Sequence, residues 1–146
     1  MEKINVLFLC TGNSARSQMA EAFLRSYGEG NFEAFSAGVE RSIINPYTRR
    51  VMEEIGFNLE GQYSKSMNEY LSTDHFEYVV TVCDDAAKNC PVFPGDGKRL
   101  HWSFDDPAVF LGTEELRLSK FREIRDLIKE KVLSWVMEQG GTTSTS

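Results

Sequence analysis

The chain has 146 residues, which is enough for one domain with a hydrophobic core and too short for two. Its hydrophobic content of 41% and charged content of 26% are ordinary for a globular protein, and its apolar runs are too short to cross a membrane. The formal net charge of −6 argues against nucleic acid or an anionic membrane as a partner, so an anionic substrate must be held by local donors.

The first residues lead directly into an apolar run, without the hydrophobic region and cleavage site of a signal peptide, so we expect a cytoplasmic protein. The chain contains three cysteines, an odd number, and structural disulfides are uncommon in a reducing compartment. We therefore expect these cysteines to be catalytic, metal-binding or simply buried.

The first predicted elements are a buried strand over 4–9 and a helix over 18–27 whose apolar residues recur on one face. The intervening segment 10–17 reads Cys-Thr-Gly-Asn-Ser-Ala-Arg-Ser. A cysteine therefore stands on a turn of small residues between the end of a strand and the start of a helix.

This turn has the properties of an anion site. Amides in the turn and in the first helical turn lack internal partners, and the helix dipole adds positive potential. The planar guanidinium of Arg16 suits a tetrahedral oxyanion, and the same field favours the thiolate of Cys10. The alternative is an inert buried cysteine beside a surface arginine. The residues expected to bind the anion are Thr11, Gly12, Asn13, Ser14, Ala15, Arg16 and Ser17.

The remaining predicted elements alternate between strands and helices. In chain order they are a short strand over 31–38, a helix from the Asn45-Pro46 pair to residue 54 or 55, a short helix near 66–71, a buried strand over 76–82, a strand over 98–102, and a long amphipathic helix from Thr113 to about 139. We expect one domain over 1–139 and a disordered polar tail over 140–146.

Strands that alternate with helices predict a parallel sheet, whose ligands bind beyond the carboxyl ends of the strands. Cys10 and Cys83 each follow a predicted strand, and the Asp105-Asp106 pair follows a third. We therefore expect these residues to meet at one edge of the sheet.

Six residues separate Cys83 from Cys90, a spacing that does not suit structural zinc, and the two histidines are not placed as partner ligands. The two cysteines are either buried bystanders or a reactive pair. A short helical turn over 84–88 would hold them too far apart for a disulfide, so the segment would have to unwind before they reacted.

Asp106 precedes a proline and lies near the expected anion site. Its carboxyl group suits a general acid that protonates the leaving oxygen of a bound oxyanion. The alternative is that Asp105 and Asp106 only form a turn, which is common for Asp-Pro.

The segment 10–21, the Cys83 to Cys90 region and the stretch 101–108 together resemble the thioredoxin-coupled arsenate reductases of the low-molecular-weight tyrosine phosphatase family. The resemblance extends from about residue 3 to 138. It departs from the family at Ala15, where a cysteine outside the redox set is often found. It implies a flavodoxin-like, doubly wound α/β fold with a four-stranded parallel sheet and helices on both faces.

The resemblance also implies a mechanism. Cys10 attacks arsenate that is held by the loop and Arg16, and Asp106 acts as the acid. Cys83 then forms a disulfide with Cys10 and releases arsenite, and Cys90 moves the disulfide to Cys83–Cys90 for reduction by thioredoxin or a similar dithiol protein. Ser14 and Ser17 would donate to the thiolate. Phosphate or sulfate would compete with arsenate, and we expect a monomer without cofactor or metal.

Family members that bind potassium use Asn13, Glu21 and Ser36, together with an aspartate where this chain has Lys65. We hypothesise that the Lys65 ammonium stands in place of the ion and pairs with Glu21. The alternative is a solvated surface lysine.

Two other functions stay open. The first is a low-molecular-weight phosphatase that hydrolyses phosphoesters through a Cys10 phospho-enzyme; it is disfavoured mildly because the chain lacks the paired tyrosines that often follow the acid Asp-Pro. The second is a non-enzymatic sensor of oxyanions or redox state, which would not need Asp106. Cys83 separates reductase from phosphatase, because both need Cys10.

Overall fold

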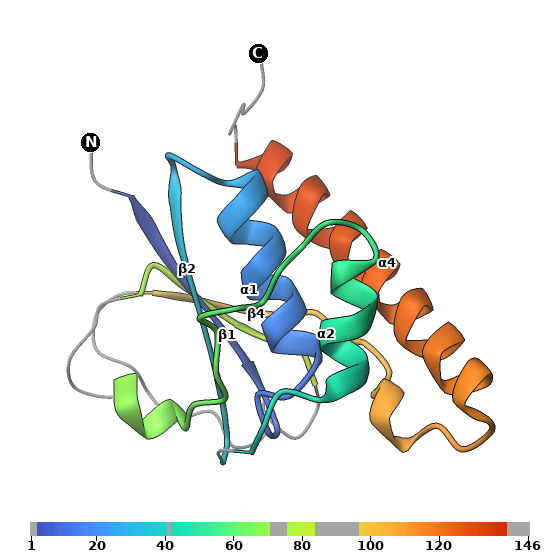
Figure 1. Ribbon diagram of the computed structural model, residues 1–146. Coiled ribbons are helices and arrows are strands. Elements are labelled where there is room, and N and C mark those ends of the chain that lie inside the picture. Colours follow the sequence, from blue (N-terminus) through green and yellow to red (C-terminus); the bar gives the residue numbers. More distant parts are fainter. Residues whose placement is uncertain (1–2, 41, 71–75, 84–96, 140–146) are drawn as a thin grey trace.

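The computed structural model describes residues 3–40, 42–70, 76–83 and 97–139, and its strands form one sheet (Figure 1). The strands are β1 (Ile4–Cys10), β2 (Phe32–Gly38), β3 (Tyr78–Thr81) and β4 (Lys98–His101), in the order β2-β1-β3-β4. All neighbours pair in parallel. The predicted parallel, flavodoxin-like sheet is therefore confirmed.

Both faces of the sheet are covered. The α-helices are α1 (Arg16–Tyr27), α2 (Pro46–Glu53) and α4 (Glu114–Glu138), and the short 3₁₀ helices are η1 (Met67–Tyr70) and η2 (Pro107–Val109). Phe8 contacts Trp102, which in turn contacts Trp135 of α4. Phe35 of β2 pairs with Leu7, the neighbour of Phe8 in β1, so its side chain lies on the opposite face of the sheet from Phe8. There it contacts Tyr70 of η1. In the described residues this second face thus carries a 3₁₀ helix.

Two of the three described α-helices begin directly after a residue whose side chain caps the helix. The Asn45 side chain accepts from the Tyr47 amide at the start of α2, and the Thr113 hydroxyl accepts from the Leu116 amide at the start of α4. The first helix differs, because α1 begins at Arg16, two residues before the predicted start, and its N-cap Ala15 gives no side-chain cap. The first amides of α1 are therefore left for another partner.

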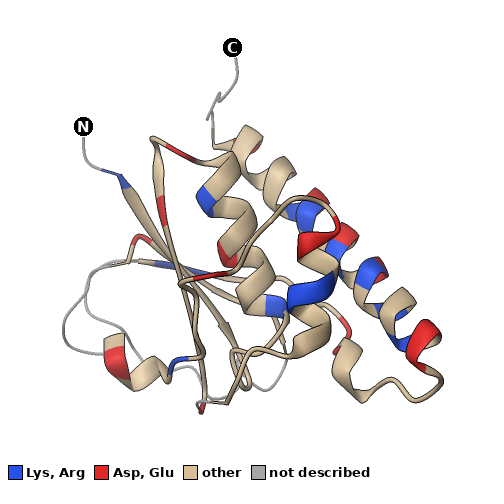
Figure 2. Ribbon diagram, viewed as in Figure 1, with Lys and Arg blue, Asp and Glu red and all other residues tan. Residues whose placement is uncertain are grey.

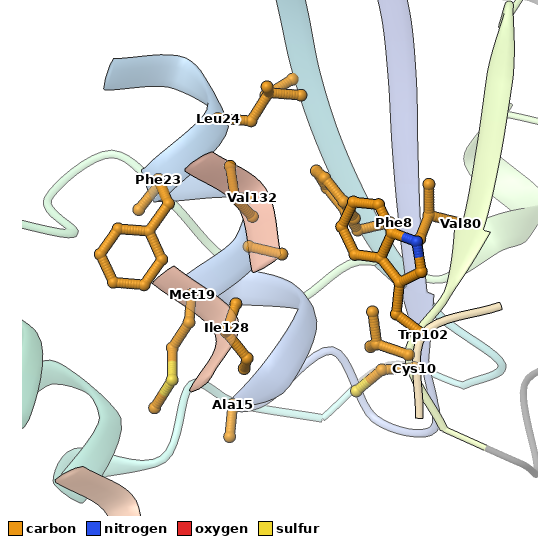
Figure 3. Close-up of a cluster of buried hydrophobic side chains, with 14 of the residues drawn as sticks. Phe8, Cys10, Ala15, Met19, Phe23, Leu24, Val80, Trp102, Ile128 and Val132 are labelled. Atoms are coloured by element: carbon orange, nitrogen blue, oxygen red, sulfur yellow. The ribbon is translucent and has the colours of Figure 1, made fainter. Parts of the chain in front are cut away.

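The core lies between the sheet and the helices α1 and α4. Figure 3 shows buried side chains of both helices beside Phe8, Val80 and Trp102, with Cys10 at the end of the cluster near Ala15. Both tryptophans of the chain, Trp102 and Trp135, are buried in this core. Two leucines of α4, Leu116 and Leu127, are exposed and lie outside its buried apolar face.

Two predicted strands are shorter than expected. β3 covers four of the residues 76–82, although Glu77 and Val82 still donate to β1 carbonyls at either end, and β4 ends before Trp102. No helix in the described ranges is long and apolar enough to cross a membrane. The predicted tail over 140–146 and the helical turn over 84–88 lie outside the described residues.

Candidate active site

The loop between β1 and α1 has its carbonyl groups turned outward. Five consecutive carbonyl oxygens accept hydrogen bonds from neighbouring segments at 2.8–3.1 Å. The pairs, given donor first, are Val39 N to Cys10 O, Glu40 N to Thr11 O, Ser64 Oγ to Gly12 O, Gln18 Nε2 to Asn13 O, and Asn45 N to Ser14 O. Because carbonyl and amide of a peptide point in opposite directions, the amides face the inside of the loop, as an anion nest requires.

Asn13 holds this loop in its turn. Its φ of 53° lies in the left-handed region, which asparagine tolerates better than most residues. Its buried side chain donates to Ser17 Oγ at 2.8 Å and to Ser36 Oγ at 2.9 Å, and it accepts from the Lys65 amide at 2.8 Å. Three hydrogen bonds from three segments thus fix the one strained residue of the loop.

Arg16 points into the same site from the first turn of α1. Its side chain is buried, with Nη1 donating to the Phe104 carbonyl at 3.0 Å and Nη2 lying 3.5 Å from Asp106 Oδ2. Its Nε is buried and has no hydrogen-bond partner within the described residues. A buried charged donor without a partner is costly, so this atom marks where an anionic ligand would complete the site.

Cys10 ends β1 and is only 3% exposed. A hydrogen bond from the Cys83 thiol, the charge of Arg16 and hydrogen bonds from Ser17 hold the pKa of the Cys10 thiol well below its usual range, although burial acts in the opposite direction. These neighbouring groups therefore favour the predicted thiolate form of Cys10.

Cys83 lies beside Cys10 and not in a remote part of the core. It is buried, its sulfur is 3.3 Å from Thr11 Oγ1, and no disulfide joins it to Cys10. The structure thus brings two of the three predicted sulfurs to one site. Cys90 lies outside the described residues.

Asp106 caps a turn with one carboxylate oxygen and faces Arg16 with the other. Its Oδ1 accepts from the Ala108 amide at 2.9 Å and caps η2, as a turn residue does, while its Oδ2 faces Arg16. Asp105 points away from the site: its side chain is 81% exposed, and its Oδ2 lies 3.7 Å from Lys120 Nζ. Of the two acids, only Asp106 is placed to serve the site.

Lys65 is buried and lies 4.0 Å from Glu21 Oε1, so the predicted pairing is present and the alternative of a solvated surface lysine is wrong. Of the predicted hydroxyl donors to the thiolate, Ser17 is in place, and Ser14 contributes a carbonyl on the outside of the loop. Within the described ranges, no three His, Cys, Asp or Glu residues are arranged to hold a metal ion.

Two contacts that shape the site were not predicted from the sequence. The Phe104 carbonyl holds Arg16, and Gln18 links Asn13 O to Tyr63 O with its side-chain amide. A backbone carbonyl leaves no signal in a sequence. Gln18 is fully buried on the side of α1 that also carries Glu21 and Arg25, so the polar pattern of this side gave no sign that the residue is buried.

Basic and acidic residues alternate along α4 (Figure 2), and the net charge of −6 gives an anion no overall attraction to the protein. The attraction must come from the loop amides, Arg16 and the end of α1. The arrangement as a whole suits a nucleophilic thiolate that attacks a bound tetrahedral oxyanion, with an acid nearby.

Known proteins share this arrangement. Residues 5–142 match the family described as Low molecular weight phosphotyrosine protein phosphatase. An arsenate reductase of Shouchella clausii (strain KSM-K16) is 43% identical over 132 residues, which cover 90% of this chain and 94% of that protein. A solved structure described as an arsenate reductase in the phosphate binding state has a TM-score of 0.74 at 29% identity, covering 92% of this chain and 98% of that one.

The fold extends further than the sequence similarity. The tyrosine phosphatase Wzb from Escherichia coli K30, in complex with sulphate, has a TM-score of 0.76 at only 19% identity, and the match covers 95% of this chain and 100% of Wzb. The chain therefore belongs to the low molecular weight phosphotyrosine protein phosphatase family, in the group whose members are named arsenate reductases.

Proposed function

We propose that this protein reduces arsenate to arsenite through Cys10, Cys83 and Cys90 and is regenerated by thioredoxin or a similar dithiol protein. The observation that carries the proposal is the second thiol at the site: Cys83 is hydrogen-bonded to Cys10 and lies 3.3 Å from Thr11 Oγ1. Relatives about 40% identical are named arsenate reductases, which supports the same substrate here.

In the first step the loop amides and Arg16 hold arsenate, as the outward carbonyls and the unpartnered Arg16 Nε suggest. The Cys10 thiolate attacks arsenic, and a hydroxyl group leaves as water after taking a proton from Asp106. The guanidinium between loop and acid stabilises negative charge on the oxyanion as the bond forms.

In the second step the Cys83 thiolate attacks the sulfur of Cys10. The electron pair of the sulfur–arsenic bond stays with arsenic, which leaves as arsenite, and Cys10 and Cys83 form a disulfide. Arsenic gains two electrons and the two cysteines lose two. Cys90 then attacks Cys83, frees Cys10 and leaves a Cys83–Cys90 disulfide for the reductant. This requirement for a dithiol reductant is the reason that we assign the reaction to the cytoplasm, and we expect the chain to act as a monomer.

Hydrolysis of phosphoesters is the second candidate, and the loop itself favours it, because a thiolate, an anion nest and an acid are what a phosphatase of this family needs. Thiols do not reduce phosphorus(V). With a phosphoester the same loop would only transfer the phosphoryl group to Cys10 and then to water. A non-enzymatic sensor is the third candidate, and it gives no reason for Asp106 to face Arg16.

The test uses Cys83→Ser with wild-type protein as reference. We expect the variant to lose multiple-turnover arsenate reduction, measured as arsenate-dependent NADPH oxidation with thioredoxin and its reductase, and to keep slow hydrolysis of an aryl phosphate. Mass spectrometry after one turnover should find Cys83–Cys90 linked in the wild type and Cys10–Cys83 trapped in Cys90→Ser. Three free thiols after arsenate treatment of the wild type would refute the relay, and a protein with neither activity would be a sensor.

A further inference from the structure

A lysine is buried directly behind the anion loop. Lys65 is 5% exposed, and its ammonium donates to the Tyr63 carbonyl at 2.8 Å and lies over the Tyr63 ring, 4.6 Å from the ring centre. Burial lowers the pKa of Lys65, and the nearby carboxylates of Glu21 and Glu69 oppose this effect. A buried lysine is rare unless its charge is paired, so the position requires a reason.

The partner is Glu21, a buried carboxylate on α1. Lys65 Nζ lies 4.0 Å from its Oε1, and Arg25 forms an ion pair with its other oxygen. The potassium site of some family members does not fit these residues, because Lys65 replaces the aspartate ligand and its ammonium group lies at the Glu21 carboxylate. Two side-chain cations already balance the single charge of Glu21.

From Glu21 a chain of hydrogen bonds leads to the thiol. Ser36 Oγ donates to Glu21 Oε1, so it accepts from Asn13 Nδ2. The same Asn13 amide donates to Ser17 Oγ, which leaves the Ser17 proton for Cys10. Each hydrogen bond in this chain has one direction, because the Asn13 amide nitrogen can only donate to the two serine hydroxyls and the Glu21 carboxylate accepts from Ser36.

Lys65 also touches the loop directly. Its backbone amide donates to Asn13 Oδ1 at 2.8 Å, and its carbonyl accepts from the Gly38 amide at 2.8 Å. The Lys65 backbone therefore holds the side-chain oxygen of Asn13 directly. The Lys65 ammonium is connected to the side-chain nitrogen of Asn13 through Glu21 and Ser36. A loss of the ammonium would leave Glu21 in a buried site with less compensation.

We propose that Lys65 is a built-in cation that takes the place of a metal ion behind the anion loop, and that it positions Asn13 and Ser17 so that Cys10 is kept as a thiolate. Lys65 is a positioning residue, because it acts on Cys10 through Glu21, Ser36, Asn13 and Ser17. The proposal concerns the state of the thiol and does not depend on which oxyanion the enzyme converts.

The test replaces the ammonium by an apolar group of similar length, Lys65→Met. The matched control is Lys3→Met, which removes a lysine from an exposed ion pair with Glu33. The full-length proteins are alkylated with iodoacetamide across a pH series without arsenate, and mass spectrometry follows the peptide that contains Cys10. We expect Lys65→Met to raise the pKa of Cys10 by about one, which corresponds to a roughly tenfold lower alkylation rate at low pH. Lys3→Met should match the wild type.

A merely structural lysine would lower the melting temperature without moving the alkylation profile of Cys10, and that result would overturn the proposal. The route is tested by Ser36→Ala, which breaks the chain between Glu21 and Asn13. We expect Lys65→Met to change the Cys10 profile much less in that background than in the wild type. Full additivity of the two changes would refute transmission through Ser36. If the wild type did not reduce arsenate but its Cys10 alkylation profile responded to Lys65→Met as expected, that result would count against the proposed function alone.

Discussion

The contact between Thr11 and Cys83 gives a sharp prediction about the second chemical step. Thr11 Oγ1 lies 3.3 Å from Cys83 Sγ in a partly buried setting. On the proposed mechanism Cys83 must become a thiolate before it attacks Cys10, and a hydroxyl donor stabilises that thiolate. Thr11→Val keeps the shape of the side chain and removes the donor.

The magnitude follows from one hydrogen bond. A hydrogen bond to a neutral group contributes about 0.5–1.5 kcal/mol and one to a charged group about 1.5–3 kcal/mol. Sulfur is a weak acceptor and the site is only partly buried, so we take about 1–1.5 kcal/mol for the thiolate. Since about 1.4 kcal/mol is a factor of ten in rate, Thr11→Val should slow the attack of Cys83 roughly five- to tenfold.

The assay is a single turnover with arsenate in a Cys90→Ser background, in which the Cys10–Cys83 disulfide accumulates and is followed by rapid quench, alkylation and mass spectrometry. Thr11→Ser is the matched control, because it keeps the hydroxyl and loses only the methyl group. Hydrolysis of an aryl phosphate, which uses the Cys10 site but not Cys83, should change less than twofold in rate. Equal slowing of hydrolysis and disulfide formation would refute the reasoning, because the hydroxyl would then act on the loop as a whole.

Three further predictions concern stability and ion dependence. Hydrogen bonds from Arg122 and then Arg125 lower the pKa of Glu54, so Glu54 stabilises the fold above its unfolded pKa and loses this effect as the pH falls through its folded value. In urea denaturation, the free energy of unfolding of the wild type should exceed that of Glu54→Gln at pH 7, and the difference should disappear below about pH 4. Ile128→Ala, at a fully buried position on α4, should lower the free energy of unfolding by about 2–5 kcal/mol, measured by urea denaturation. Potassium should raise neither activity nor melting temperature more than sodium does at equal ionic strength, because the Lys65 ammonium lies at Glu21; a sharp potassium-specific rise would contradict this.

The elements and the anion loop were predictable because local patterns decide them. Apolar periodicity locates β1 and α1, and the capping side chains of Asn45 and Thr113 mark two helix starts. The start of α1 was placed too late because Arg16 and Ser17 are polar, and in this protein they lie buried in the first helical turn, where they serve the site.

The remaining features of the site depend on loops that only the tertiary structure brings together. The Phe104 carbonyl meets Arg16 across 88 positions of sequence, and Cys83 meets Thr11 across 72. A pattern in the chain predicts that Cys83 lies at the same edge of the sheet as Cys10, but it does not predict a hydroxyl contact. From the sequence, Lys65 could either pair with Glu21 or be a solvated surface lysine. Its contacts with Tyr63 and Glu21, which the fold brings together, show that it pairs with Glu21.

The hydrogen bond between Cys83 and Cys10 suggests how one pair of sulfurs serves two successive steps. In the free protein the hydrogen bond from Cys83 is the largest of the effects that lower the pKa of the Cys10 thiol. On the proposed mechanism the bond to arsenic removes the charge of Cys10, and with it the reason for Cys83 to keep its proton toward that sulfur. The Thr11 hydroxyl stays beside Cys83, and the sulfur that was a donor becomes a nucleophile within reach of the one that it must attack. A phosphatase has no use for this second thiol, because phosphorus(V) accepts no electrons from it, so the position of Cys83 is the feature of the fold that favours reduction over hydrolysis.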